Sequence, residues 1–96
     1  MPVYMIGYDL HPSSREVYDK LYTALDNTAL EAVGCGYWDC LESTWLVITE
    51  KTPAQIRDEL KQHLKEDDRL LVMRYGEGAA WHGFKDDCRV WLEDKL

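Results

Sequence analysis

Residues 3–10 read Val-Tyr-Met-Ile-Gly-Tyr-Asp-Leu, and this stretch decides the fold of the chain. β-branched and aromatic residues favour an extended strand, and successive side chains of a strand point to opposite faces of a sheet. Both alternating sets are largely apolar until Asp9, so we predict a central strand that is covered on both faces. The strand should end before Pro12, because a proline disfavours the helical conformation at the residue that precedes it.

Two helix starts follow from capping patterns. The segment 13–16 (Ser-Ser-Arg-Glu) matches a capping box, and the segment 52–55 (Thr-Pro-Ala-Gln) adds a proline at the first helical position. Apolar residues at spacings of three and four continue the first helix, and it should end near Val33, because Gly34 and Gly36 beyond it allow a positive φ. The second helix has a buried stripe at four-residue intervals, formed by Ile56, Leu60 and Leu64.

The remaining strand-like runs complete a recognisable order. Residues 37–41 and 44–50 are separated by a short connection and therefore predict a hairpin. Residues 69–75 (Arg-Leu-Leu-Val-Met-Arg-Tyr) form the last clear strand. Strand, helix, strand, strand, helix, strand is the ferredoxin-like βαββαβ plan of an α+β sandwich, with four antiparallel strands and both helices on one face.

The chain continues beyond what this plan needs. We assign residues 1–78 to a ferredoxin-like domain and 79–96 to a C-terminal extension, with a short extra strand over 79–84 and an acidic helix over 85–96. One sheet face lacks helices, and the extension or a second subunit should cover it. A small chain with four Trp and six Tyr has more aromatic surface than one core can bury. We therefore expect a homodimer packed through the sheet face, with the extension swapped onto or packed against the partner.

Composition excludes several classes of protein. The 96 residues include 11 Lys and Arg against 18 Asp and Glu, a net charge of −7, and 46% are hydrophobic, as is usual for a globular domain. No apolar run approaches the roughly 18 residues of a membrane span, and the start of the chain lacks the basic region of a signal peptide. We expect a cytoplasmic protein that does not associate with membranes.

The cysteines predict free thiols. Cys35, Cys40 and Cys88 are an odd number at no familiar spacing, which is not typical of a disulfide framework. Structural zinc sites usually present pairs of ligands two to four residues apart. The spacing of these cysteines, together with His63 or His82, does not match that pattern.

Asp9 is the first candidate for a functional residue. A carboxylate at the carboxyl end of a central strand can bind a hard cation such as Mg²⁺, which enzymes hold with only one or two protein carboxylates. An aspartate here also commonly forms an Asx turn or caps the following helix. His11 is a candidate second ligand or general base, and its alternative is an exposed loop histidine.

The run Tyr-Met-Ile-Gly-Tyr-Asp-Leu at residues 4–10, followed by a helix, resembles the opening of the CRISPR-associated Cas-two family and its relatives. These relatives include the SinR-like proteins and virulence-associated protein D. Residues 38–46 (Trp-Asp-Cys-Leu-Glu-Ser-Thr-Trp-Leu), 52–57 and 67–72 are similar to later segments of the SinR-like proteins. The resemblance covers roughly residues 3–84.

This resemblance implies a metal-dependent nuclease that acts on RNA or DNA. In its dimer, Asp9 of both subunits would hold one Mg²⁺, which would lower the pKa of a bound water and clamp the scissile phosphate. Nucleic acid needs a basic strip beside such a metal. Arg15 and Arg74, together with Lys20 and Arg69, are the residues that we place near that strip.

Two other functions fit the same sequence. Several members of the family are inactive as nucleases, so the chain could be a catalytically silent dimeric adaptor in a nucleic-acid-processing complex. The acidic clusters at 66–68, 86–87 and 93–94 also fit a protein inhibitor that imitates nucleic-acid phosphate and docks on a basic groove. The net negative charge favours this last alternative over general nucleic-acid binding, which depends on neutralising phosphates.

Overall fold

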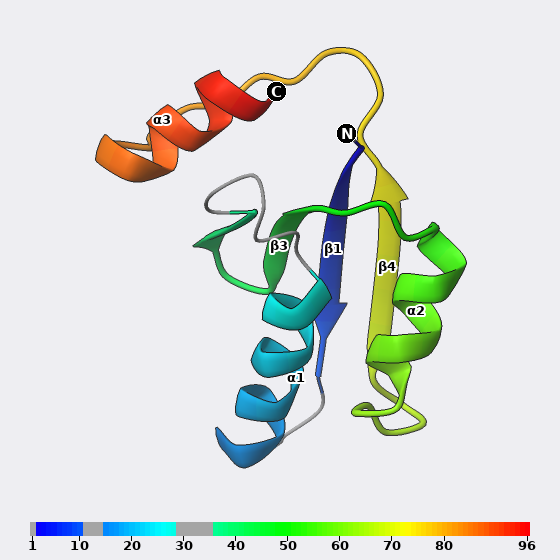
Figure 1. The fold of residues 1–96 in the computed structure, drawn as a ribbon. Coiled ribbons are helices and arrows are strands. Elements are labelled where there is room, and N and C mark those ends of the chain that lie inside the picture. The colour runs from blue at the N-terminus through cyan, green and yellow to red at the C-terminus, as the bar shows by residue number, and fades with distance from the viewer. Residues whose placement is uncertain (1, 11–14, 29–35) are drawn as a thin grey trace.

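The computed structural model describes residues 2–10, 15–28 and 36–96 (Figure 1). Its elements confirm the predicted βαββαβ order and the ferredoxin-like α+β fold, followed by one more helix. Ser13 and Val33 lie outside the described residues, and so do the predicted cap and end of the first helix. The elements are β1 (Val3–Asp9), α1 (Arg15–Thr28), β2 (Tyr37–Leu41), β3 (Thr44–Ile48), α2 (Pro53–Lys61), β4 (Arg69–Arg74) and α3 (Asp86–Lys95).

The four strands form one antiparallel sheet in the order β2-β3-β1-β4. β1 therefore lies between two neighbours, as its apolar faces predict. In the register, Ile6 lies opposite Trp45 of β3 and Val72 of β4. β2 and β4 are the edge strands, which leaves β4 with one side unpaired.

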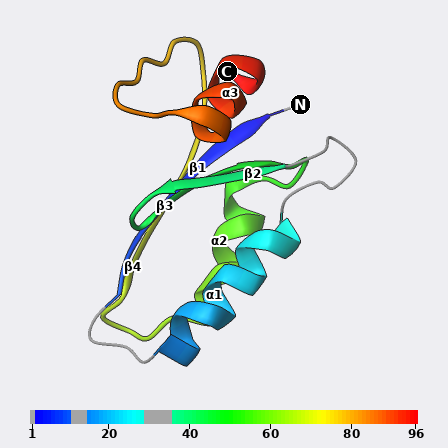
Figure 2. The ribbon, with the colours of Figure 1, turned by 90° about the vertical axis from the view of Figure 1, so that its left-hand side faces the viewer.

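α1 and α2 cover one face of the sheet (Figure 2). The alternation of β1 sends Tyr4, Ile6 and Tyr8 to this face, where they are buried against the apolar stripes of both helices. Each fully buried aliphatic side chain contributes about 1.5–3 kcal/mol to folding, so this layer is the main core. Its other buried members are Leu21, Leu25, Trp45, Val47, Ile56 and Leu60.

The start of α2 has the capping box that its sequence predicts. The Gln55 backbone N–H donates to Thr52 Oγ1 at 3.2 Å, and the Thr52 N–H donates to Gln55 Oε1 at 2.9 Å. Pro53 follows the cap, where a missing N–H has no cost because the first helical N–H groups lack partners within the helix. Among the described residues, no helix is long and apolar enough to cross a membrane.

The C-terminal extension forms a loop and a helix, and the expected strand over 79–84 is wrong. Gly78 and Gly83 have φ angles of +100° and +87°, which lie outside the extended region that a strand requires. The chain therefore turns before it reaches α3.

α3 packs on the sheet face opposite α1 and α2, at the end where the chain begins (Figure 2). Trp91 and Leu92 of α3 are buried there against Val3, Trp38 and Ile48. We call this side of the sheet the open face, because α3 covers only one end of it. The extension thus supplies a second, smaller core within its own chain.

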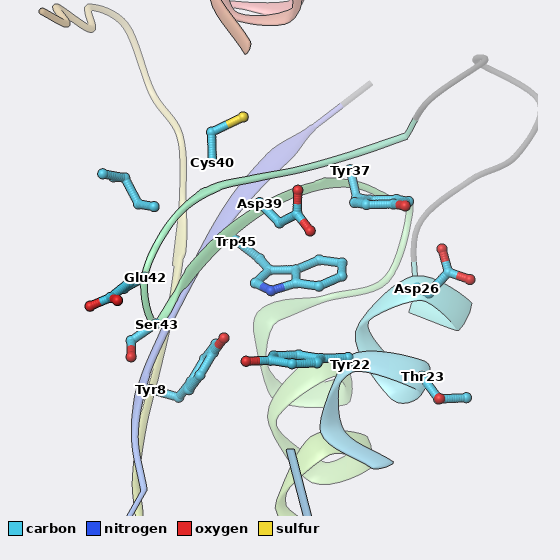
Figure 3. A pocket seen from close by; sticks show the side chains of 11 residues that line it. Tyr8, Tyr22, Thr23, Asp26, Tyr37, Asp39, Cys40, Glu42, Ser43 and Trp45 are labelled. Atoms are coloured by element: carbon cyan, nitrogen blue, oxygen red, sulfur yellow. The ribbon is translucent and has the colours of Figure 1, made fainter. Parts of the chain in front are cut away.

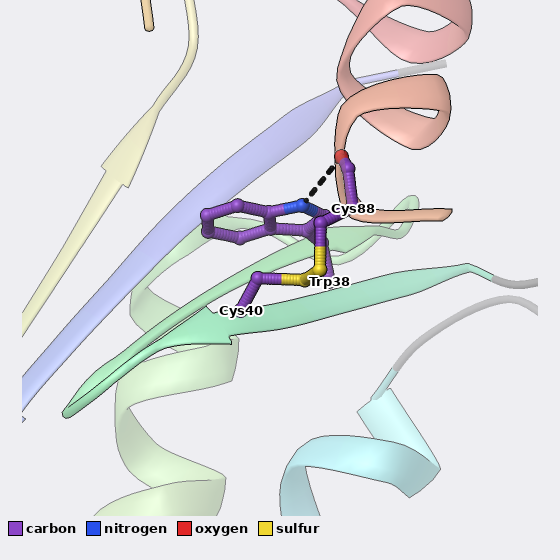
Figure 4. Close-up of a disulfide and its surroundings, with 3 residues drawn as sticks. All are labelled: Trp38, Cys40 and Cys88. Carbon is purple, nitrogen blue, oxygen red and sulfur yellow. Dashed lines mark hydrogen bonds between the residues drawn. A yellow bond between two sulfur atoms is a disulfide. The ribbon is translucent and has the colours of Figure 1, made fainter. Parts of the chain in front are cut away.

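A disulfide between Cys40 of β2 and Cys88 of α3 fixes this arrangement (Figure 4). The expectation of free thiols is wrong for these two residues, and Cys35 lies outside the described residues. The Cα atoms of the pair are 6.1 Å apart although 48 residues separate them in sequence. The bond depends on how α3 packs, so no local cysteine spacing could predict it.

Trp38 adds two non-covalent links beside the disulfide. Its Nε1–H donates to the Cys88 carbonyl oxygen at 3.0 Å (Figure 4). Its ring meets Phe84 edge-on, with the centroids 5.0 Å apart. Burial of the indole ring is favourable, and the hydrogen bond of its N–H removes the cost of burying that polar group. These contacts hold β2 and the extension together.

Candidate functional site

Asp9 is the last residue of β1 and is exposed. Tyr8 beside it is buried on the helix side, so the alternation of the strand places Asp9 on the open face. α3 packs near Val3, at the other end of the same strand. The extension therefore leaves Asp9 uncovered.

Arg69 lies directly opposite Asp9 on β4. Directly opposite residues of an antiparallel pair share a face, with Cβ atoms about 4.5–5.5 Å apart. Asp9 and Arg69 therefore occupy neighbouring positions of adjacent strands at this end of the open face. A guanidinium can donate two parallel hydrogen bonds to a phosphate group, so the pair combines a cation ligand with an anion ligand.

The turn between β2 and β3 forms another wall of the site. Ser43 has a φ of 56°, and its carbonyl oxygen accepts a hydrogen bond from the Tyr8 N–H at 3.0 Å. This bond holds the turn against the end of β1. Ser43 and Thr44 therefore line, with Asp9 and Arg69, a shallow pocket of about 410 Å³.

Gly7 leaves the middle of this pocket open. It lies between Thr44 and Leu71 in the register, and a Cβ built on it would meet no atom within 4 Å. A larger side chain here would fill the pocket without striking the backbone. Gly7 is therefore a position from which the pocket can be blocked experimentally.

The pocket offers oxygen ligands, which suit a hard cation such as Mg²⁺, but only a few of them. Among the described residues that line the pocket, Asp9 is the only acidic one, and the hydroxyl groups of Ser43 and Thr44 are the other side-chain oxygen donors on the open face. Among the described residues, no group of three or more His, Cys, Asp or Glu could hold a metal ion. One subunit thus offers Mg²⁺ a single carboxylate, and a phosphate, water or a second subunit must complete the coordination.

The structure does not bring all of the expected cationic residues to Asp9. Arg74 lies opposite Tyr4, which is about 16 Å along the strand from Arg69 at 3.3 Å per residue. Lys20 is on α1, behind the sheet, where its Nζ is 3.7 Å from Glu16 Oε1. Arg69 alone of the four expected cations is placed beside Asp9 by a described contact.

Two expected site residues are not placed. His11 lies outside the described residues, so its expected role as ligand or base stays a prediction. Arg15 begins α1, but its side chain is outside the described part of the structure. Its expected role in nucleic-acid binding also stays a prediction.

The sequence did not single out Ser43, and it gave Arg69 no more weight than the other three cations. The signal for Ser43 was its place in a two-residue turn. Its proximity to Asp9 also depends on β3 pairing with β1, which the hairpin alone does not determine. The importance of Arg69 depends in the same way on the register of β4 with β1.

An apolar row runs from this pocket along the open face. Leu71 and Met73 of β4 are 53% and 50% exposed, and Met5 beside them is half-buried. The row leads into an apolar cavity of about 340 Å³ between the sheet and the extension. Contiguous exposed apolar side chains of this kind are typical of a protein interface.

No protein-family model matches this chain, and no curated protein matches it significantly. The resemblance to the Cas-two-like families stays an expectation from the sequence.

Proposed function

We propose that this chain is a homodimeric, Mg²⁺-dependent nuclease whose site is built from Asp9 of both subunits. The observation that carries the proposal is the position of Asp9. It is an exposed carboxylate at the end of a central strand, on the face that the helices leave bare, and it lies beside Arg69.

The exposed row of Leu71 and Met73 supports the dimer. In a twofold dimer the same surface patch of each subunit meets its copy, so residues close to the axis meet their own equivalents. Gly7 and Leu71 lie in the Asp9 pocket, so packing through this row brings the two pockets together. Two carboxylates that approach one another repel unless a cation or a proton lies between them.

The residues present fit a magnesium site of this shared kind. Asp9 of each subunit would hold the ion, and hard oxygen donors are the ligands that it prefers. When bound, Mg²⁺ supplies charge neutralisation at the phosphate and activation of water. Arg69 would bind a phosphate oxygen of the substrate, and Arg15 and Arg74 would extend the contact along the nucleic-acid backbone, with His11 as the base.

A silent dimeric adaptor is the second candidate. The observation that favours it is the single carboxylate that each subunit supplies to the pocket. A net charge of −7 also opposes binding to a polyanion. The same dimer would then serve as a scaffold within a nucleic-acid-processing complex.

Cleavage assays separate the two functions. Labelled RNA and double-stranded DNA are incubated with Mg²⁺ or Mn²⁺ and with wild type, Asp9→Ala or Glu77→Ala. Glu77 is an exposed acid beyond the other end of β4, so its variant controls for the loss of one charge. The nuclease predicts metal-dependent cleavage that Asp9→Ala loses by at least about a hundredfold and Glu77→Ala keeps. Absence of cleavage by the wild type with either metal would leave the adaptor.

A further inference from the structure

A second pocket lies on the other side of the sheet, between α1 and the β2–β3 hairpin (Figure 3). Its volume is about 620 Å³, within the range of roughly 300–1,000 Å³ that is usual for small-molecule sites. The Asp9 pocket opens on the open face, and this one opens on the helix side. The two pockets share Tyr8 and Ser43 at the end of β1, but Asp9 and Arg69 line only the first, and the carboxylates Asp26, Asp39 and Glu42 line only the second. Binding in the second pocket therefore does not require the proposed nuclease site.

Four aromatic rings form the wall of this pocket: Tyr8, Tyr22, Tyr37 and Trp45. Tyr37 stacks on Trp45 with centroids 4.9 Å apart, and Trp45 stacks on Tyr22 at 5.9 Å. Trp45 is only 6% exposed, whereas Tyr22 is 38% exposed. The stack thus runs from the core to the solvent, and its outer ring is accessible to a ligand.

Three carboxylates surround the aromatic wall: Asp26 of α1, Asp39 of β2 and Glu42 of the hairpin turn. None of the described residues that line the pocket is a Lys, Arg or His. Among the described residues, none of these three carboxylates forms an ion pair. The pocket therefore carries negative charge that no described side chain neutralises.

Tyr8 adds a neutral polar group inside the pocket. Its hydroxyl group points toward that of Tyr22 (Figure 3). Burial, together with its hydrogen bond to Tyr22, raises the pKa of Tyr8 well above its usual value. Its phenol stays protonated at physiological pH and can donate or accept a hydrogen bond.

Aromatic faces and carboxylates select the same kind of ligand. The face of an aromatic ring attracts a cation, most strongly at Trp, and carboxylates attract it over a longer range. The aromatic wall favours an organic cation over a bare metal ion, because a metal ion prefers oxygen ligands to the faces of aromatic rings. A planar guanidinium suits both features, since it stacks on aromatic rings and donates paired hydrogen bonds to a carboxylate.

We propose that this aromatic–acidic pocket binds a guanidinium group, stacked on the Tyr22 side of the aromatic wall and hydrogen-bonded to Asp39 or Asp26. The guanidinium could belong to a small metabolite or to an arginine side chain of a protein, because the recognising chemistry is the same. The Asp39 carboxylate lies beside the Tyr37 and Trp45 rings, and Asp26 lies at the outer edge of the pocket, on α1 (Figure 3).

An NMR titration of the full chain tests the proposal. The probes are agmatine, a blocked arginine (N-acetyl-arginine amide), and the matching citrulline compound, which has a similar shape but no charge. Saturable shifts are expected at the Trp45 indole N–H and at the Tyr22 and Asp39 amides, with the blocked arginine or agmatine but not with citrulline. If both agmatine and the blocked arginine bind, a small guanidinium compound is sufficient as the ligand. If only the blocked arginine binds, the ligand is identified as an arginine side chain of a protein.

Matched variants make the test specific. Asp39→Asn should weaken binding about fivefold, the upper range for a partly exposed charge pair. Asp26→Asn, on a different element, gives an independent measure if Asp39→Asn does not fold. Glu77→Gln, far from the pocket, should bind as wild type does. The proposal would be overturned by equal shifts with the citrulline compound or by no shifts at these three resonances. It would also be overturned if both Asp variants bound with the affinity of wild type.

Discussion

At the scale of single residues, position in the register decides which chemistry a side chain can perform. Tyr8 and Asp9 are neighbours in sequence, yet they lie on opposite faces of β1: Tyr8 is buried among the core residues under the helices, whereas Asp9 is exposed. The alternation of the strand was sufficient to predict this separation. Which residues accompany Asp9 depends on long-range pairing, so Arg69 lies beside it while Arg74 does not.

The raised pKa of Tyr8 predicts a loss of stability at alkaline pH. Above about pH 10 the unfolded chain releases this phenolic proton, while burial and Tyr22 keep it bound in the folded chain. The unfolded state then binds fewer protons, so the free energy of unfolding falls as pH rises, by up to about 1.4 kcal/mol per pH unit for this group. Below pH 10 both states keep the proton, and the effect is absent.

Urea denaturation of wild type and Tyr8→Phe at several values between pH 8 and about pH 11 measures this effect. The variant lacks the phenol, so its stability should fall less steeply than that of wild type above pH 10. Parallel slopes for the two proteins would contradict the assigned environment of Tyr8.

At the scale of elements, local patterns predicted what local interactions determine. The capping box of α2, the hairpin and the apolar periodicity of the helices are short-range features, and the structure confirms the element order that they predict. The strand expected over 79–84 was wrong because a glycine with a positive φ, Gly83, interrupts the segment between its two aromatic residues, and Gly78 with a positive φ precedes it. The aromatic side chains serve instead to pack the extension on the sheet, as Phe84 does against Trp38.

The Cys40–Cys88 disulfide is expected to stabilise the fold strongly. It joins residues 48 apart in sequence, and closing a loop of this length is worth roughly 2–4 kcal/mol. Replacing both cysteines by serine should lower the free energy of unfolding by about that amount in urea denaturation. A loss below about 0.5 kcal/mol would mean that α3 is held by packing alone.

Alkylation in urea provides the matching chemical check. Because denaturation exposes every free thiol, the chain should accept one alkyl group without reductant and three after reduction. Three groups without reductant would show that the bond is absent from the isolated protein.

At the scale of the whole molecule, the extension divides the open face into a covered end and a free end. The covered end has its own core around Trp91, and the free end presents Leu71, Met73 and the Asp9 pocket. The sequence predicted that one face needed a cover and that aromatic residues were in excess. It did not predict that a disulfide links the extension to β2, or that the extension leaves Asp9 uncovered.

Substitution of the free end should dissociate the proposed dimer. Leu71→Asp places charge in the apolar row, and Val90→Asp places it on α3 at a residue of nearly equal exposure, 52% against 53%. Sedimentation equilibrium should show a dimer for wild type and Val90→Asp and a monomer for Leu71→Asp. A monomer for Val90→Asp and a dimer for Leu71→Asp would place the interface on the extension. A monomer for wild type and both variants would show that the proposed dimer does not form.

The central claim, that two Asp9 carboxylates share one cation, is tested most directly by the stoichiometry of Mn²⁺ binding measured by electron paramagnetic resonance. We predict one bound ion per two chains, lost in Asp9→Ala and in Leu71→Asp and retained in Glu77→Ala. Absence of binding, binding of one ion per chain, or binding that survives Asp9→Ala would contradict the claim.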